Sequence, residues 1–108
     1  MPVRQAGSDQ EAGVNHHIPV NYDQLPGHMR ESTRAYIETG RPVGDFLTAV
    51  LQNNLMEAFR RADDKNRAAM PEWVCFLHNE APADCYGSRQ AVKAWRERGG
   101  MNGKAGAA

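Results

Sequence analysis

Apolar side chains recur at intervals of three and four residues through the middle of the chain, which is the spacing of one face of an α-helix. The strongest such run lies within residues 41–64, RPVGDFLTAVLQNNLMEAFRRADD. The pattern predicts a central helix. Its predicted inward face consists of Phe46, Leu47, Val50, Leu51, Leu55, Ala58, Phe59 and Ala62.

The charges at the two ends of this run support a helix. Asp45 falls in the first turn, and Arg60 and Arg61 fall in the last, where each sign of charge interacts favourably with the helix dipole. The weak point is the Gln-Asn-Asn triplet at 52–54, because asparagine competes with helical hydrogen bonding. The segment could therefore divide into two helices.

Three further helices are predicted around the central run. Pro26 suits a first helical turn and Gly40 a left-handed helix end, so the first helix is placed near 26–39. Its expected apolar stripe is Met29, Thr33, Tyr36 and Ile37.

The segment 63–79 is predicted to contain a short helical turn and then a main helix from Pro71 to about Asn79. Asp63 or Asp64 can cap the short turn, and Pro71 cannot occupy a helix interior without removing a hydrogen bond. The apolar surface expected on the main helix is Trp73, Val74, Phe76 and Leu77.

The last helix is expected after Ser88, a plausible N-cap, with Val92 and Trp95 facing inward and Gly99 as the stop. No stretch alternates apolar and polar residues as a half-buried strand would. The fold class predicted is therefore all-α, a compact bundle of four or five short helices. Residues 21–99 form its single domain, between a flexible leader at 1–20 and a flexible tail at 100–108.

Charge and composition exclude several classes of protein. Thirteen Lys and Arg residues balance thirteen Asp and Glu residues, so no overall field attracts nucleic acid or an anionic membrane. No apolar run is long enough to span a bilayer, and the N-terminal residues lack the apolar core of a signal peptide. Cys75, on a predicted buried helix face, and Cys85, in a loop, are expected to be free thiols. These features favour a cytoplasmic protein.

The loop at 78–88, HNEAPADCYGS, carries the densest group of polar side chains between two predicted helices. Each has a structural explanation as a turn or cap residue. As a group, they could instead bind an anion at a helix N-terminus and stack an aromatic ring. The arginines around the Asp63-Asp64 turn could be simple surface ion pairs, or they could clamp a phosphate if that turn packs near the loop. The candidate ligand-binding residues are Arg60, Arg61, Arg67, His78, Asn79, Glu80, Tyr86 and Ser88.

Catalytic and metal-binding alternatives are weaker. The phosphate-loop, dinucleotide-binding and HExxH motifs are missing, so we expect no enzyme, no cofactor and no metal. A Cys85–His78 nucleophilic pair would need only spatial proximity, but no third group is visible. The spacing of His78, Glu80, Asp84 and Cys85 matches no zinc template, which favours capping and turn duties for them. His16 and His17 could bind a metal, but adjacent histidines in a tail are more often simply solvated.

The ordered string LPGHMR, YIETGRPVGDFLTAVLQNNLMEAF, ADDKNRAA and NEAPADCYGS, followed by AW and a glycine pair, covers residues from about 25 to 100. In this string the chain resembles a group of small proteins of phages and prophages. The resemblance implies no catalytic residues. Its phage context implies, by analogy, an accessory protein that blunts host immunity.

Two functions follow as hypotheses. In the first, a non-enzymatic anti-defence protein sequesters a nucleotide-derived immune signal, such as a cyclic nucleotide or an ADP-ribose derivative, in the loop and arginine region. A small core offers little concavity for this, so a homo-oligomer is expected. In the second, an exposed helix face inhibits or adapts a host or phage protein, because a small monomer cannot easily bury its whole apolar stripe.

Overall fold

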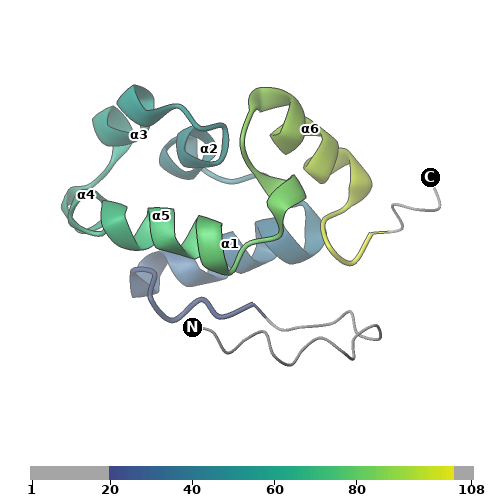
Figure 1. Cartoon of the computed structure of the whole chain (residues 1–108), viewed down its shortest axis with the longest axis horizontal. Coiled ribbons are helices and arrows are strands. Elements are labelled where there is room, and N and C mark those ends of the chain that lie inside the picture. Colours follow the sequence, from purple (N-terminus) through teal and green to yellow (C-terminus); the bar gives the residue numbers. More distant parts are fainter. Residues whose placement is uncertain (1–19, 104–108) are drawn as a thin grey trace.

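The computed structural model describes residues 20–103, and this part of the chain is entirely helical, without a strand. The all-α prediction is confirmed (Figure 1). Six α-helices and one short 3-10 helix follow in order: α1 (Gly27–Thr39), α2 (Asp45–Leu51), α3 (Leu55–Arg61), α4 (Asp64–Ala68), α5 (Met70–Asn79), η2 (Ala83–Cys85) and α6 (Arg89–Arg98).

The predicted start and stop residues do mark the ends of α1 and α6. Gly40 ends α1 in the left-handed conformation, with φ 77°, and its N–H donates to the carbonyl oxygen of Tyr36 over 2.8 Å. Ser88 caps α6 by accepting a 3.0 Å hydrogen bond from the N–H of Ala91. Gly99 ends the helix with φ 89°.

The predicted central helix is divided at residues 52–54, where the asparagines interrupt it. Asn53 adopts φ 64°, the left-handed conformation that asparagine tolerates better than most residues. The side chain of Asn54 then caps α3 by accepting a 3.2 Å hydrogen bond from the N–H of Glu57. The divided run folds back, so that α2 and α3 pack against each other.

The segment after α3 also follows the sequence prediction. Asp63 caps α4 through a 2.7 Å hydrogen bond from the N–H of Asn66, and Pro71 lies in the first turn of α5. Asn66 is buried, and its Oδ1 accepts a 3.3 Å hydrogen bond from Trp73 Nε1. One residue therefore ties α4 to the core.

Both tryptophans are core residues, as their helical positions predicted. Trp95 donates from Nε1 to the carbonyl oxygens of Tyr36 and Ile37, at 3.1 and 3.2 Å. The ring of Trp73 packs edge-on against Phe46, with centroids 5.5 Å apart. The largest fully buried side chains are Trp73, Tyr36, Phe76, Leu25, Ile37, Leu47, Leu51, Thr33 and Cys85.

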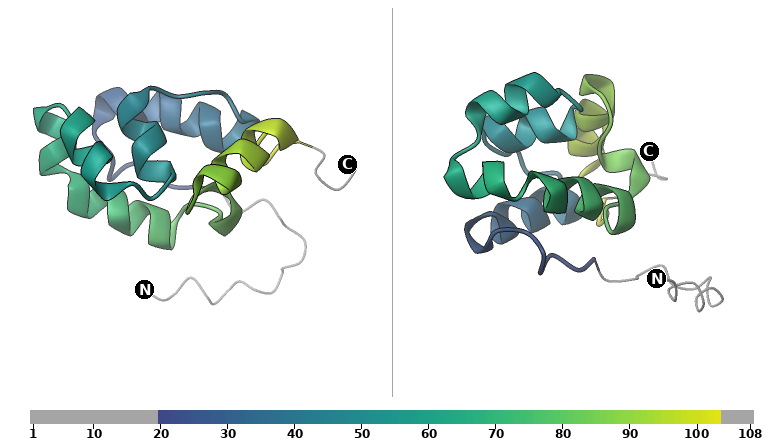
Figure 2. Two further views of the ribbon diagram at one scale, coloured as in Figure 1. Left: turned by 90° about the horizontal axis from the view of Figure 1, so that it is seen from above. Right: turned by 60° about the vertical axis from the view of Figure 1, so that its left-hand side comes forward.

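Figures 1 and 2 show how the helices are distributed around this core. In Figure 1, α1 and α5 make up the lower part of the molecule, with α1 behind. Helices α2 and α3 lie above them at one end, and α6 lies above at the other. Helix α6 contacts both η2 and α2. The loop at 78–88 therefore lies where three parts of the chain meet.

Residues 100–103, assigned to a flexible tail from the sequence, are held against α1. The N–H groups of Met101 and Asn102 donate to the carbonyl oxygens of Ile37 and Glu38, at 2.8 and 2.9 Å. Gly100, with φ 73°, makes this return possible, because a Cβ there would lie 2.6 Å from the amide nitrogen of Gly40. Residues 1–19 of the predicted leader and residues 104–108 of the tail lie outside the described residues.

Four sequence predictions of burial are wrong. Leu55 and Phe59 of α3 are 61% and 41% exposed, and Val74 of α5 is 59% exposed. The break at 52–54 is the physical reason for the first two, since it turns α3 out of the line of the apolar stripe of α2. Cys75 is exposed as well, because α5 buries Trp73 and Phe76 on its other side.

Candidate functional site

The backbone of the 78–88 loop is fixed by bonds to distant helices. The hydroxyl of Tyr36 donates to the carbonyl oxygen of Cys85 over 2.7 Å, from a fully buried position in α1. The N–H of Gly87 donates to the carbonyl oxygen of Leu51, also over 2.7 Å. The loop is therefore joined to the C-terminal halves of both α1 and α2.

Two candidate binding residues of this loop have structural partners. Ser88 Oγ caps α6, as described above. Glu80 accepts a 3.1 Å hydrogen bond at Oε1 from the N–H of Asn21, which attaches the segment before α1. Asn79 is exposed at the last position of α5. For Ser88 and Glu80 the geometry favours the turn and cap explanation over a ligand-binding one.

The three candidate arginines form salt bridges with nearby Asp and Glu side chains. Arg61 donates to Glu57 Oε2 at 2.7 Å and to Asp45 Oδ2 at 2.9 Å, and Arg60 donates to both Glu57 oxygens at 3.1 and 3.2 Å. The hydrogen bonds to Glu57 lower the pKa of its carboxyl group below the usual value, and the bond from Arg61 contributes most. Arg67 donates to Asp64 and to the carbonyl oxygen of Ala62, both at 3.1 Å.

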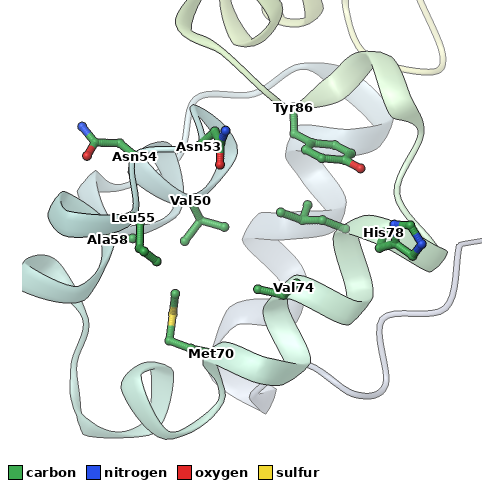
Figure 3. Close-up of a pocket in the computed structure, with 10 residues that line it drawn as sticks. Val50, Asn53, Asn54, Leu55, Ala58, Met70, Val74, His78 and Tyr86 are labelled. Carbon is green, nitrogen blue, oxygen red and sulfur yellow. The ribbon is translucent and has the colours of Figure 1, made fainter.

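The remaining two candidates, His78 and Tyr86, lie together at a hollow between α2–α3 and α5. The close-up in Figure 3 shows Val50 and Leu55 on one side facing Met70 and Val74 on the other. His78 and Tyr86 lie at the end away from Met70. The residues that line it are Val50, Asn53, Asn54, Leu55, Ala58, Met70, Val74, Leu77, His78 and Tyr86.

The chemistry of this hollow is mainly apolar. Its volume is about 270 Å³, close to the lower end of the roughly 300–1,000 Å³ of small-molecule pockets. None of the three candidate arginines is among its lining residues. The predicted phosphate clamp and the predicted aromatic platform are therefore not brought together among residues 20–103.

Two further exposed apolar side chains, Met56 and Phe59, lie on α3 outside the lining of the hollow. On a helix, Phe59 and Met56 follow Leu55 around the axis by about 40° and about 100°. Met56 is 81% exposed, the highest value among the large apolar side chains. With Val74 across the hollow, these are all the exposed large apolar side chains of the described residues. We call the hollow together with Leu55, Met56, Phe59 and Val74 the α3–α5 surface.

The environment of Cys85 does not suit a nucleophile. Its side chain is fully buried, and burial raises the pKa of the thiol to about 12. The reactive thiolate is therefore disfavoured at neutral pH. His78 is exposed and lines the hollow, and no hydrogen bond between these two side chains exists in the structure. Of the two cysteines, Cys75 is the accessible one.

A metal site has no support in residues 20–103, which hold no group of three or more His, Cys, Asp or Glu side chains placed to bind an ion. His16 and His17, the other candidate ligands, lie outside the described residues. Within the same range, no helix combines the length and apolar character needed to cross a bilayer.

Sequence reasoning missed most of the α3–α5 surface. It assigned Leu55, Phe59 and Val74 to the core, and it did not single out Met56. One signal pointed to the surface: the asparagines at 52–54, which could end one helix and re-orient the next. The exposed fractions themselves depend on how α3 packs beside α5, which local sequence does not specify.

Comparison with known protein families, with curated proteins and with solved structures found no match to this chain.

Proposed function

We propose that this chain is a non-enzymatic protein-interaction module that binds an apolar segment of another protein chain on the α3–α5 surface. One observation carries the proposal: of the four exposed large apolar side chains of residues 20–103, Leu55 and Val74 line one hollow, and Met56 and Phe59 lie on the same short helix as Leu55. Single exposed apolar residues are ordinary, whereas a contiguous patch with a concave centre is typical of interaction sites.

The form of the surface favours a helix or a short apolar segment as its ligand. Helices α2 and α3 border the hollow on one side and α5 on the other, and an apolar helix can place anchor side chains at i, i+3 and i+4 into such a groove. At one end Asn53, His78 and Tyr86 offer hydrogen-bonding groups for the rim of the contact. A host or phage protein, as expected from the sequence, would be inhibited or adapted by this contact.

Site-specific photo-crosslinking in the host cell tests this proposal. A crosslinking residue at position 56 is expected to give a discrete protein adduct, because Met56 is almost fully exposed within the surface. The same residue at Gln90, exposed on α6, is the control and should give none. A charge introduced by Val74→Arg should remove the adduct at position 56. Equal adducts from both positions, or none from position 56, would refute the proposal.

Sequestration of a nucleotide-derived signal stays a prediction, with less geometric support. The hollow has room for a base, and Tyr86 could stack on it, but the arginines expected to bind phosphate are engaged with carboxylates. Thermal shift with cyclic nucleotides and ADP-ribose derivatives tests it. A shift that Tyr86→Ala abolishes, and that Gln90→Ala leaves intact, would favour this function over protein binding.

A further inference from the structure

We propose that a stripe of basic side chains along α6 binds the phosphate backbone of double-stranded nucleic acid. The stripe consists of Arg89, Lys93 and Arg96 of α6, together with Arg41 from the segment between α1 and α2. We call these four residues the α6 basic stripe. Helix α6 lies at the end of the molecule opposite α3 and α4 (Figure 1). The inference therefore goes beyond the proposed function and concerns a different surface.

The spacing along α6 places its three basic residues on one face of the helix. Residues 89, 93 and 96 follow each other at intervals of four and three. At 3.6 residues per turn they fall within about 60° of each other around the helix axis. All three are exposed, whereas Val92 and Trp95 supply the buried face. The stripe therefore faces solvent over most of the length of the helix.

The fourth cation comes from the other side of a hollow that borders this face. The residues that line the hollow are Gly40, Pro42, Lys93, Arg96 and Glu97. The two sides approach closely, since a Cβ on Gly40 would lie 3.0 Å from the carbonyl oxygen of Arg96. Arg41 directly follows Gly40 and is exposed. The fold thus adds Arg41 to the charges of α6.

Three of the four side chains keep their charge without a partner. Arg41, Arg89 and Arg96 make no salt bridge and no side-chain hydrogen bond to any residue from 20 to 103. In that range, Lys65 on α4 is the one other Lys or Arg in this condition. Lys93 is bonded to Glu97 at 2.7 Å. Four cations and this one carboxylate leave a net charge of +3 on the stripe.

The neutral total charge of the chain conceals this local excess. Residues 89–103 contain four Lys or Arg residues and one Glu, whereas residues 68–88 contain three Asp or Glu residues and no Lys or Arg. At about 0.1 M salt, exposed charges more than about 10 Å apart are largely screened from each other. Binding at α6 therefore depends on the local charge, which a polyanion such as a phosphodiester chain complements.

A duplex suits this stripe better than a membrane or a single strand does. Helices that bind membranes also insert apolar side chains, and proteins that bind single strands stack bases on aromatic rings. The exposed large apolar side chains of residues 20–103 all belong to α3 and α5, and Trp95 of α6 is 2% exposed. The stripe offers charge and hydrogen-bond donors alone, which are the groups that contact phosphates.

Fluorescence anisotropy tests the proposal on the full chain with a labelled DNA duplex of roughly 20 base pairs at about 50 mM salt. We expect a Kd on the order of 10 μM and a slope of log Kobs against log salt of about −3 to −4. Arg89→Gln and Arg96→Gln should each weaken binding about threefold and make the slope shallower by about 1. Lys65→Gln, the matched control, removes an unpaired charge from α4 and should leave Kd unchanged.

Circular dichroism and the Tm check that the variants fold, and Arg41→Gln, outside α6, should weaken binding as the α6 variants do. No binding to the duplex up to roughly 100 μM would overturn the proposal. Equal weakening by Lys65→Gln would overturn it as well, because binding would then follow total charge and not the stripe. Tighter binding to vesicles containing phosphatidylserine, or to a single strand of the same sequence, would overturn it in favour of that partner.

Discussion

Tyr36 and Cys85 are 49 positions apart in the sequence, and the hydroxyl of one donates to the carbonyl oxygen of the other over 2.7 Å in the protein interior. This bond holds the polar loop against α1. A buried carbonyl that loses its donor costs about 1–3 kcal/mol. Tyr36→Phe should therefore lower the free energy of unfolding by roughly that amount, measured by urea denaturation.

Tyr86→Phe is the matched control, because Tyr86 is half-buried and its hydroxyl makes no hydrogen bond to any residue from 20 to 103. Its free energy of unfolding should stay within about 0.5 kcal/mol of the wild type. Equal losses for the two variants would mean that the Tyr36 bond contributes nothing specific.

Gly100 is a position that does not tolerate a side chain. A Cβ there would lie 2.5 Å from the amide nitrogen of Thr39 and 2.6 Å from that of Gly40, and φ is 73°. Strain and overlap with rigid backbone predict a loss of about 3 kcal/mol or more for Gly100→Ala. Thermal unfolding measures it.

Gly27→Ala is the contrasting substitution, since nothing lies within 4 Å of a Cβ at that helical position. It should be neutral or stabilising by about 0.5 kcal/mol, because alanine restricts the unfolded chain. A tolerated Gly100→Ala would show that residues 100–103 do not return to α1 in solution.

The two cysteines should differ in reactivity. At pH 8 a thiol reagent should modify Cys75 rapidly and Cys85 only after denaturation, because Cys85 is buried with a pKa raised to about 12. Cys75→Ser should abolish the fast phase. Rapid reaction of two thiols in the folded wild type would contradict the burial of Cys85.

The same shift predicts a dependence of stability on pH. The folded state keeps the Cys85 proton more tightly than the unfolded state, whose thiol has its ordinary pKa of 9.0. The contribution is therefore complete below pH 9 and is lost as the pH rises towards 12. Cys85→Ala should unfold with a flatter pH profile in that window. Burial is also the main cause that raises the pKa values of Tyr22 and Tyr36, so these two groups likewise make the folded state less stable as the pH rises.

The turn between α2 and α3 should respond differently at its two asparagines. Asn54→Ala removes the cap of α3 and should cost about 1 kcal/mol. Asn53→Gly should be neutral or stabilising, since glycine adopts φ 64° without strain, whereas Asn53→Ala should cost about 1 kcal/mol. Chemical denaturation of the three variants gives the comparison. The reverse order would contradict the left-handed conformation at Asn53.

The sequence predicted the helices well because their ends are specified locally. Pro26, Gly40, Asp63, Ser88 and Gly99 act within one turn of themselves, and each marks a boundary in the structure. The core tryptophans were predictable for the same reason. Which apolar residues stay exposed was not predictable, because this depends on the fold-back at Asn53 and on the packing of α3 beside α5.

The candidate site also has a part that local sequence predicts and a part that depends on packing. The sequence identified a dense polar loop, but it could not show that the backbone of that loop is hydrogen-bonded to the Tyr36 hydroxyl and to the Leu51 carbonyl oxygen. It joined the arginines to the loop only on the condition that their turn packs near it, with surface ion pairs as the alternative. In the structure, Arg60 and Arg61 pair with Glu57, Arg61 also pairs with Asp45, and Arg67 pairs with Asp64. The residues that line the hollow extend from Val50 to Tyr86 in the sequence, so no local motif predicts it.

The anchoring of Tyr86 between two bonded neighbours has a consequence for recognition. Cys85 is fixed to α1 and Gly87 to α2, so the wall that Tyr86 contributes is already in place before any ligand arrives. A pre-organised wall loses little conformational entropy on association. Tyr36→Phe, which removes one of these bonds, should therefore lower the affinity for the bound chain, although Tyr36 itself does not line the hollow.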